Sequence, residues 1–357
     1  EPMAMGDPMR YIGARKADIS ALFANCNRGK ESLRIDLKSD EGVRVIKEMI
    51  PSVDVVIHNF RPGVMDKLGL GSETLRTINP KLIYTAISGF GTEGPMSSVP
   101  AYDPIIQAHA GVAATQGKGD EPAFMRTLLC DKITGYTACQ AVTSALFLRE
   151  RTGVGQHIDL SMIDSGLFFI FLDGFQNHTL LSDDHERAGM LIDILYDPWV
   201  CSDGGVIISA GSYEMQKRFL TSIDMQHLLD DERFATFENQ MRNIHVLKGL
   251  VSKRCAQLSC DDMVGRLREV DVPCAKVMTR DEVLAQDQLV ANGTVDIYDH
   301  PIAGSSRRVL APPLFGGERL APGSGAPTHG QHTRAVLESF GISETDIQKL
   351  SSEGVVA

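Results

Sequence analysis

The pattern of apolar and polar positions predicts alternating strands and helices in the first half of the chain. Apolar runs at 54–59 and 81–88 are typical of buried strands, and residues 32–37 can form an earlier strand. Apolar positions at helical spacing over 43–50 and 65–68 predict a helix after each of the first two strands. Strands that alternate with helices at such short spacing form parallel βαβ units. We therefore expect an α/β fold with a doubly wound, mostly parallel sheet.

The stretch 151–172 contains an abrupt change of period. Alternation over 158–162 predicts a strand with one buried face, and the apolar run 167–172 predicts a helix. Asp164 stands at the corner between them. An aspartate there can be a helix N-cap, because its carboxylate accepts from the free N–H groups of the first turn. It can also be a nucleophile or base at the mouth of an α/β sheet, where ligands bind. The local pattern leaves both roles open.

A second, smaller region of mixed structure is predicted after residue 200. Residues 199–209 contain two apolar runs around a Gly-rich turn and predict a hairpin. Runs at 272–277 and 293–298 predict further strands, and helical segments lie between them. A Pro- and Gly-rich stretch at 312–327 is typical of a linker, and two helices separated by Gly341 end the sequence.

Three parts of the chain follow from these patterns. We expect a large α/β domain over 1–190 and a small α+β domain over 200–310. Residues 311–357 are expected to form a linker and C-terminal helices that return to the large domain. Linkers of this length are unusual inside a compact monomer.

Composition and charge narrow the possible functions. The net charge of −11, with acidic residues spread along the chain, argues against non-specific binding to nucleic acid. No apolar run approaches the roughly 20 residues that span a bilayer. The seven cysteines include no CxxC pair, which is typical of reduced thiols in a cytoplasmic protein and not of a disulfide framework or a zinc site. We therefore expect no nucleic-acid partner, no membrane span and no metal.

The segment 89–94, GFGTEG, matches the spacing of a dinucleotide-binding fingerprint and follows a predicted strand. That fingerprint also needs a helix that opens on the last glycine, because the helix N-terminus holds the pyrophosphate. Pro95 and a further proline at position 100 follow instead. We interpret the segment as a loop that lets the backbone approach a ligand, and not as an NAD site.

Nine blocks along the chain carry a resemblance to a known family. They are GDPMR, FANCNRGKESLRIDLK, DVVIHNFRPGVMDKLGL, NPKLIYTAISGFGTEGP, AYDPIIQAHAGV, TGVGQHIDLSMIDSG, DERFATFENQMRN, VDVPCAKVMT and PTHGQHT. In this order they resemble the family III CoA-transferases, such as formyl-CoA and L-carnitine CoA-transferases, and the related α-methylacyl-CoA racemases. The resemblance implies transfer of CoA from an acyl-CoA donor to a free carboxylic acid, with no permanently bound cofactor.

The resemblance also implies a covalent mechanism. The position of Asp164 matches the family's nucleophile, which forms an anhydride with the acyl group and then an aspartyl-CoA thioester. Residues Ala210, Gly211 and Ser212 lie where the family has a flexible, often Gly-rich loop that covers the intermediate and excludes water. The glycine run is shorter in this chain.

Eight further positions match the family's contacts with CoA and the active site, at the ends of strands and in the loops that follow them. They are Ile35, Lys38, Asn59, Phe60, Arg61, Lys67, Tyr102 and Asp103.

Position 102 distinguishes the transferases from the racemases. The racemases place a histidine there and use it with an aspartate that matches Asp131 to exchange an α-proton. Tyrosine, with a reference pKa of about 10, suits proton abstraction near neutral pH poorly. We therefore favour the transferase and keep a racemase-type isomerase as the alternative. Asp131 itself stands at a predicted helix start and can be an N-cap.

The resemblance implies two further features of the protein. Family members begin with a strand, a helix and a second strand, and Glu1 corresponds to the end of that second strand. We expect these elements to be missing here, either because the sequence begins late or because the protein lacks them. Without them, a non-catalytic CoA-binding homologue is a third hypothesis. The family's long linkers form an interlocked homodimer, which we expect here. The acids are not identified; Met162, Tyr213 and segment 178–195 are candidates for selecting them.

Overall fold

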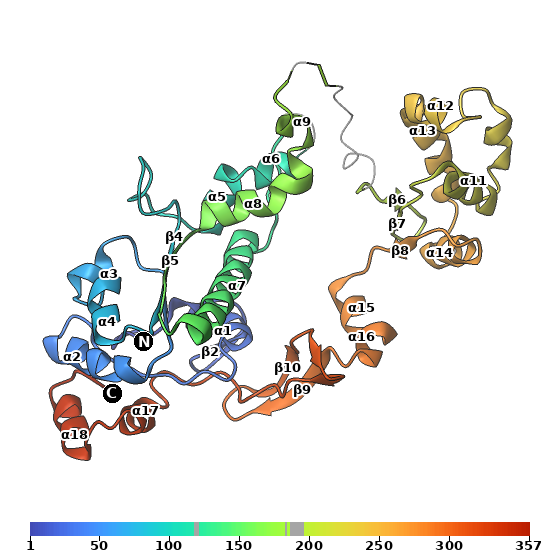
Figure 1. Ribbon diagram of the computed structural model, residues 1–357. Helices are drawn as coiled ribbons and strands as arrows, with labels where there is room; N and C mark the ends of the chain where they lie inside the picture. Colours follow the sequence, from blue (N-terminus) through green and yellow to red (C-terminus); the bar gives the residue numbers. More distant parts are fainter. Residues whose placement is uncertain (118–120, 183, 186–195) are drawn as a thin grey trace. The chain divides into compact units, whose positions relative to one another are not determined.

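The computed structural model describes residues 1–117, 121–182, 184–185 and 196–357 (Figure 1). Contacts divide the chain into two compact units. The first unit contains Glu1–Asp183 and Thr294–Ala357, and the second contains Asp184–Gly293. Within the described ranges, no helix combines the length and apolar character needed to cross a bilayer.

The first unit is built on a three-stranded parallel sheet in the order β3-β4-β5. These strands are β3 (Val55–His58), β4 (Ile83–Ser88) and β5 (His157–Ser161). Tyr84 of β4 lies between Val56 and His157 in the register. Figure 1 shows α3 (Val64–Lys67) and α4 (Ser72–Ile78) on one side of the sheet and α7 (Leu129–Thr152) on the other. The predicted α/β class is thus confirmed as a mixed α/β structure with a small parallel sheet.

Other elements of the first unit are short. Before β3 they are η1 (Pro8–Tyr11), β1 (Arg15–Lys16), β2 (Ile19–Ser20), α1 (Ala21–Cys26), α2 (Asp40–Met49) and η2 (Ile50–Ser52). After β4 they are α5 (Asp103–His109), α6 (Val112–Gln116), α8 (Met162–Gly174), α9 (Gln176–Thr179), β9 (Val295–His300), β10 (Gly304–Val309), β11 (Leu314–Phe315), β12 (Glu318–Arg319), α17 (Thr333–Ser339) and α18 (Glu344–Ser352).

The predicted strand at 32–37 is wrong. Only Ile35 pairs there, in an isolated antiparallel bridge with Val356. Its side chain is buried in a core cluster with Val45, Leu337 and Leu350. The apolar pattern of the segment therefore reflects packing against α2, α17 and α18, and not membership of the parallel sheet.

The segment 103–116 forms two short helices, α5 and α6. Helix α5 ends at His109 with Ala110 as its C-cap, and Gly111 is the N-cap of α6 with a left-handed φ of 85°. A Cβ atom at Gly111 would lie 2.8 Å from Cζ of Phe175, so glycine is required there both for the backbone conformation and for the close packing of α8's end.

The second unit combines an antiparallel sheet with helices. Its strands are β6 (Trp199–Val200), β7 (Gly205–Ile208) and β8 (Cys274–Lys276), in that order, and β6 and β7 confirm the predicted hairpin. Its helices are α11 (Tyr213–Ser222), η3 (Gln226–Asp230), α12 (Phe237–Arg242), α13 (Ile244–Cys255), α14 (Cys260–Glu269), α15 (Arg280–Ala285) and α16 (Asp287–Ala291).

Two antiparallel hairpins occur in the later part of the first unit. In the hairpin of β9 and β10, Val295 pairs with Val309, and the antiparallel pairing continues to His300 with Gly304. Strands β11 and β12 form a second hairpin within the stretch 312–327, which the sequence predicted to be a plain linker. The Gly316-Gly317 turn, with both φ values positive, makes that tight hairpin possible.

Candidate functional site

The site is built at the carboxyl ends of the parallel strands. Strands β3, β4 and β5 end at His58, Ser88 and Ser161, and Ser88 pairs with Ser161 in the register. The backbone N–H of Ile163 donates to the carbonyl oxygen of Gly89 over 3.1 Å, which fixes the start of α8 beside the end of β4. Ligands of open α/β sheets bind at this edge.

Asp164 lies in the first turn of α8 with an exposed side chain. It is not the N-cap. Ser161 has that role, because its Oγ accepts from the backbone N–H of Asp164 over 3.1 Å. The hydroxyl of the buried Ser161 in turn donates to Oδ2 of Asp164. The carboxylate is thus free of a capping role and is held at the positive end of the α8 dipole.

Asp103 is buried beneath this edge, with only 2% of its surface exposed. Its Oδ1 accepts from Nε2 of Gln107 over 2.6 Å. Its Oδ2 accepts from the backbone N–H of Asp131, in the first turn of α7, over 3.1 Å. The N-cap of α7, Leu128, has no capping side chain. Asp103 therefore caps α7 from α5, and the cap predicted for Asp131 is wrong.

The side-chain carboxyl group of Asp131 is affected by the negative charge of the buried Asp103. Burial, and then the charge of Asp103, raise the pKa of Asp131 above its ordinary value. The thiol of the neighbouring Cys130 packs against Gly166 in α8, since a Cβ atom at Gly166 would lie 3.5 Å from that sulfur. The starts of α7 and α8 are therefore neighbours.

Tyr102 precedes α5 and is 79% exposed. The residue before it, Ala101, contacts Gly89: a Cβ atom at Gly89 would lie 2.4 Å from the Ala101 Cβ. Because Gly89 also accepts from Ile163, Tyr102 belongs to the same edge of the sheet as Asp164.

The segment after β3 forms an exposed turn. Asn59, Phe60 and Arg61 are all exposed, and Nδ1 of His58 accepts from the backbone N–H of Phe60 over 3.3 Å. Lys67 is exposed at the end of α3.

The remaining predicted contacts have different environments. Lys38 is exposed in the turn before α2, where its backbone N–H donates to the Asp36 carboxylate. Ile35 is 5% exposed, so its side chain belongs to the core. Of the residues predicted to contact CoA, most are exposed in turns or at helix ends, whereas Ile35 and Asp103 are buried.

The predicted covering loop belongs to the second unit. Ser212 is the N-cap of α11 and accepts from the backbone N–H of Met215 over 3.2 Å; Ala210 and Gly211 come just before it. Tyr213 donates its hydroxyl to the carbonyl oxygen of Ala235.

The other candidates for acid selection lie in the first unit or outside the described part. Met162 packs against the core of α5, α7 and α8. Of the segment 178–195, residues 183 and 186–195 lie outside the described residues.

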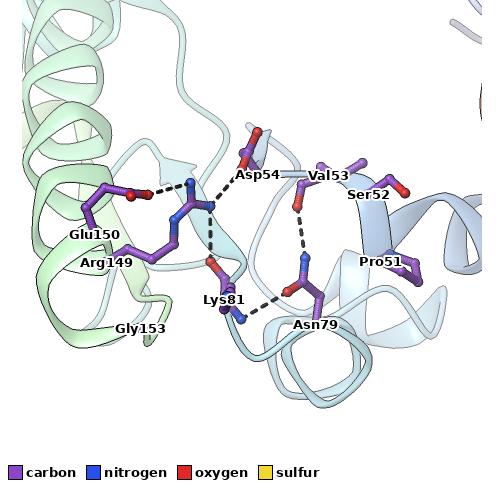
Figure 2. A pocket seen from close by; sticks show the side chains of 9 residues that line it. All are labelled: Pro51, Ser52, Val53, Asp54, Asn79, Lys81, Arg149, Glu150 and Gly153. Atoms are coloured by element: carbon purple, nitrogen blue, oxygen red, sulfur yellow. Dashed lines mark hydrogen bonds and ion pairs between the residues drawn. The ribbon is translucent and has the colours of Figure 1, made fainter.

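A polar cavity of about 380 Å³ lies at the opposite edge of the sheet, where the strands begin (Figure 2). Arg149 of α7 reaches Asp54 over 2.9 Å and the carbonyl oxygen of Lys81 over 3.4 Å. Asn79 donates to the carbonyl oxygen of Val53 over 3.0 Å. In this cavity Arg149 pairs with the carboxylates of Asp54 and Glu150, which are 74% and 75% exposed.

The described residues contain no group of three or more His, Cys, Asp or Glu side chains that could hold a metal ion. The segment 89–94 is followed by turns, so it lacks the helix that a dinucleotide fingerprint needs.

Comparison with known proteins decides the family. The model of CoA-transferase family III matches residues 1–333. The chain belongs to CoA-transferase family III.

Individual relatives agree with the family match. An acetyl-CoA:oxalate CoA-transferase of Acetobacter aceti is 34% identical over 318 residues, which cover 85% of this chain and 80% of that protein. A succinyl-CoA:glutarate CoA-transferase of Mus musculus is 28% identical, with coverage of 94% and 78%. The crystal structure of a CAIB/BAIF family protein from Brucella suis is 31% identical, with a TM-score of 0.82 and coverage of 95% and 90%.

Membership confirms the resemblance read from the sequence blocks. This family III CoA-transferase is an enzyme whose substrates are an acyl-CoA and a carboxylic acid. Sequence reasoning missed Ser161, although the Ser-x-x-Asp pattern before an apolar run is a recognised helix-start signal.

Proposed function

We propose that the enzyme transfers CoA from an acyl-CoA to a free carboxylic acid through covalent intermediates on Asp164. The observation that carries the proposal is the exposed carboxylate of Asp164 at the carboxyl edge of the sheet, at the N-terminus of α8 and relieved of capping by Ser161. A carboxylate in this position is accessible to an acyl-CoA and is not committed to stabilising the helix.

The reaction proceeds through two intermediates. Oδ1 of Asp164 attacks the thioester carbonyl, so that the C–S bond breaks and leaves an aspartyl anhydride and CoA thiolate. The thiolate then attacks Cγ of Asp164, the Cγ–Oδ1 bond breaks, and the donor acid leaves with that oxygen. The product is an aspartyl-CoA thioester.

The acceptor acid reverses these steps. Its carboxylate attacks Cγ and displaces the thiolate, which then attacks the acceptor's carbonyl and restores the Asp164 carboxylate. No proton or electron is gained or lost overall, so the chemistry needs no redox cofactor.

We propose that the exposed turns around Asp164 bind CoA. Arg61, Lys67 and Lys38 supply positive charge for its phosphates, and Asn59 and Phe60 contact the nucleotide or pantetheine. Tyr102 contacts the thioester end, as its exposure beside Gly89 allows. Ile35 and Asp103 act through the backbone and helix that they hold in place.

We propose a dicarboxylic acid as acceptor. The support is that two relatives that each match more than four-fifths of this chain are named for oxalate and for glutarate. The second carboxylate of such an acid needs a cationic or hydrogen-bonding partner when it leaves water.

The enzyme is incubated with a panel of acyl-CoAs without acceptor, quenched and digested, and the peptide that contains Asp164 is weighed. We expect a CoA adduct on Asp164 with at least one donor, and its loss when oxalate, glutarate or succinate is added. Asp164→Asn should form no adduct while still binding CoA. An unmodified peptide with every donor, from protein that binds CoA, would contradict the covalent mechanism.

We also propose a homodimer, interlocked as the resemblance implies, in which α8 lies at the interface. Phe168 and Leu172 on this helix are 77% and 80% exposed. Side chains of this kind stay in water at a cost of about 1.5–3 kcal/mol each relative to burial.

A further inference from the structure

The hydroxyl of Ser161 contacts the carboxyl group on which the proposed intermediates form. It donates to Oδ2 of Asp164, while its oxygen accepts from the backbone N–H of the same residue over 3.1 Å. Ser161 is 5% exposed, at the last position of β5, where its pairing with Ser88 fixes the backbone. The donor is therefore held in place before the reaction begins.

We propose that Ser161 is a catalytic residue whose hydroxyl stabilises the negative charge that develops on Oδ2 of Asp164. The inference rests on the covalent mechanism proposed above. It concerns the steps at Cγ of Asp164, which are distinct from the attack of Asp164 on the donor.

The two oxygens of Asp164 have different fates in these steps. Oδ1 forms the anhydride and leaves with the donor acid, so Oδ2 is the oxygen that stays on Cγ. When the thiolate attacks Cγ, the carbonyl electron pair moves onto Oδ2, and it returns when the Cγ–Oδ1 bond breaks. The same charge develops again when the acceptor carboxylate attacks the thioester. A donor aimed at Oδ2 therefore acts twice in each cycle.

The surroundings of Ser161 make this donor effective. A hydrogen bond from a buried, preoriented hydroxyl to a developing oxyanion gains more than it does in water, because little reorganisation is needed. The N-terminus of α8 adds partial positive charge at the same place. In the resting state the same bond leaves Oδ1 as the oxygen available for attack.

A purely structural role is the competing explanation, and the chain contains a matched example of it. At the start of α18, the Ser343 hydroxyl donates to Oδ2 of Asp346 over 2.6 Å and accepts from its backbone N–H over 3.1 Å. Ser343 and Asp346 thus repeat the hydrogen bonds of Ser161 and Asp164 at a helix start outside the strand-end edge. The same substitution at both serines separates capping from catalysis.

The experiment compares Ser161→Gly, Ser161→Cys and Ser161→Thr with Ser343→Gly in the full-length enzyme. Glycine is tolerated at N-caps with a loss of only a few tenths of a kcal/mol, so Ser161→Gly removes the hydroxyl with little effect on α8. Cysteine keeps the side-chain shape with a weak donor, and threonine keeps the hydroxyl. Each variant is assayed for kcat, for KM of the acyl-CoA, for melting temperature, and for the rate at which the CoA adduct appears on Asp164 after rapid quenching.

We expect Ser161→Gly to lower kcat and the rate of adduct formation by about 10²- to 10³-fold, with KM for the acyl-CoA unchanged. Ser161→Cys should give an intermediate loss, Ser161→Thr should restore most of the rate, and Ser343→Gly should leave kcat unchanged. If Ser161→Gly does not fold, the cysteine and threonine variants decide: equal rates in both overturn the proposal.

Two failures are distinguishable. If the wild-type enzyme forms no adduct with any donor, the covalent mechanism on Asp164 is wrong. If the wild-type adduct forms and Ser161→Gly forms it at the same rate, Ser161 only caps α8 and the inference is overturned while the covalent mechanism stands.

Discussion

At the scale of single residues, Asp103 matches a family site position but is buried. Both of its carboxylate oxygens accept hydrogen bonds from inside the protein, one from Gln107 and one from the first turn of α7. Gln107 also donates to the carbonyl oxygens of Met125 and Thr127, so the pair ties α5 to the segment that leads into α7. Loss of this connection is expected to affect stability before it affects CoA binding.

Replacement of Asp103 by asparagine tests that expectation. The amide oxygen still accepts from the Asp131 N–H, but the amide nitrogen then faces Nε2 of Gln107, so two donors oppose each other. We expect the free energy of unfolding to fall by about 1–3 kcal/mol, with KM for the acyl-CoA close to that of the wild type. Because the Asp103 charge contributes to the raised pKa of Asp131, that pKa should also fall. Denaturant titrations, initial rates and an NMR pH titration measure the three quantities. A large rise in KM without loss of stability would show direct contact with CoA.

The sequence revealed these residues unequally. Asp164 was recognisable because the hydrophobic period changes at it and because its surrounding block matches the family. The capping role of Ser161 follows from a local spacing and was available in the sequence. The burial of Asp103 was not, because it depends on Gln107, on the 125–127 backbone and on α7, which only the folded chain brings together.

At the scale of elements, the turn after β3 depends on the protonation of one histidine. Nδ1 of His58 accepts from the N–H of Phe60, so the ring must be neutral at that nitrogen. Burial lowers the pKa of His58 from its ordinary value of 6.5; Asp66 and Asp159 raise it, and His157 lowers it. The ring also lies edge-on to Tyr84. Neutral His58 therefore supports the turn that we propose for CoA.

Acidification is expected to weaken acyl-CoA binding through this turn. Because the folded-state pKa of His58 is below its unfolded value, the unfolded chain binds more protons, and stability is lost as pH falls from about 6.5 through the lowered pKa. KM for the acyl-CoA should rise over the same interval as the Phe60 N–H loses its acceptor. His58→Asn retains an acceptor without titrating in this range, so its KM should stay flat. Equal pH profiles for the two proteins would exclude His58 as the cause.

Strands were more predictable than the segments between them. The strands β4 and β5 lie where their apolar patterns predicted. A strand that is buried on one face shows alternating apolar positions, and a strand that is buried on both faces shows a continuous apolar run. The segment 32–37 has a similar pattern, yet its apolar residues serve a cluster made with α17 and α18. Periodicity reports that a side chain is buried and does not report which partner buries it.

At the scale of the whole molecule, the apolar surface of α8 bears on assembly. Phe168 and Leu172 are more exposed than large apolar side chains usually are, on a helix that also carries Asp164. If a second copy of the chain covers this face, dimer formation and the position of Asp164 depend on the same helix.

A charge on α8 should therefore break the proposed homodimer. We expect Leu172→Glu to give a monomer by light scattering after size-exclusion chromatography, because a buried unpaired carboxylate opposes association. Val290→Glu is the matched control, since Val290 is 69% exposed on α16 of the second unit. A dimeric Leu172→Glu, or a dimer lost equally in both variants, would argue against α8 as the interface.

The placement of the β9–β10 hairpin was beyond the reach of sequence patterns. The sequence predicts only its first strand, at 293–298, and contacts place the hairpin with the first unit from Thr294 onward. The contacts include the bond from Arg28 to the carbonyl oxygen of Val309 and the bond between His300 and Ala326. The bond from Arg28 joins residues 281 positions apart in the chain, so the composition near residue 294 does not indicate it.

The interruption of the first unit by the second has a consequence for how the protein is made. A ribosome releases the chain from its N-terminus, so the core of the second unit, from Cys201 to Val272, can close as soon as that stretch has emerged. One core cluster of the first unit, in contrast, joins Ile35 and Val45 to residues 337–356. The apolar face of α2 therefore stays exposed to water through most of translation. Nascent chains that are halted before α17 are the ones most prone to aggregation and most dependent on chaperones.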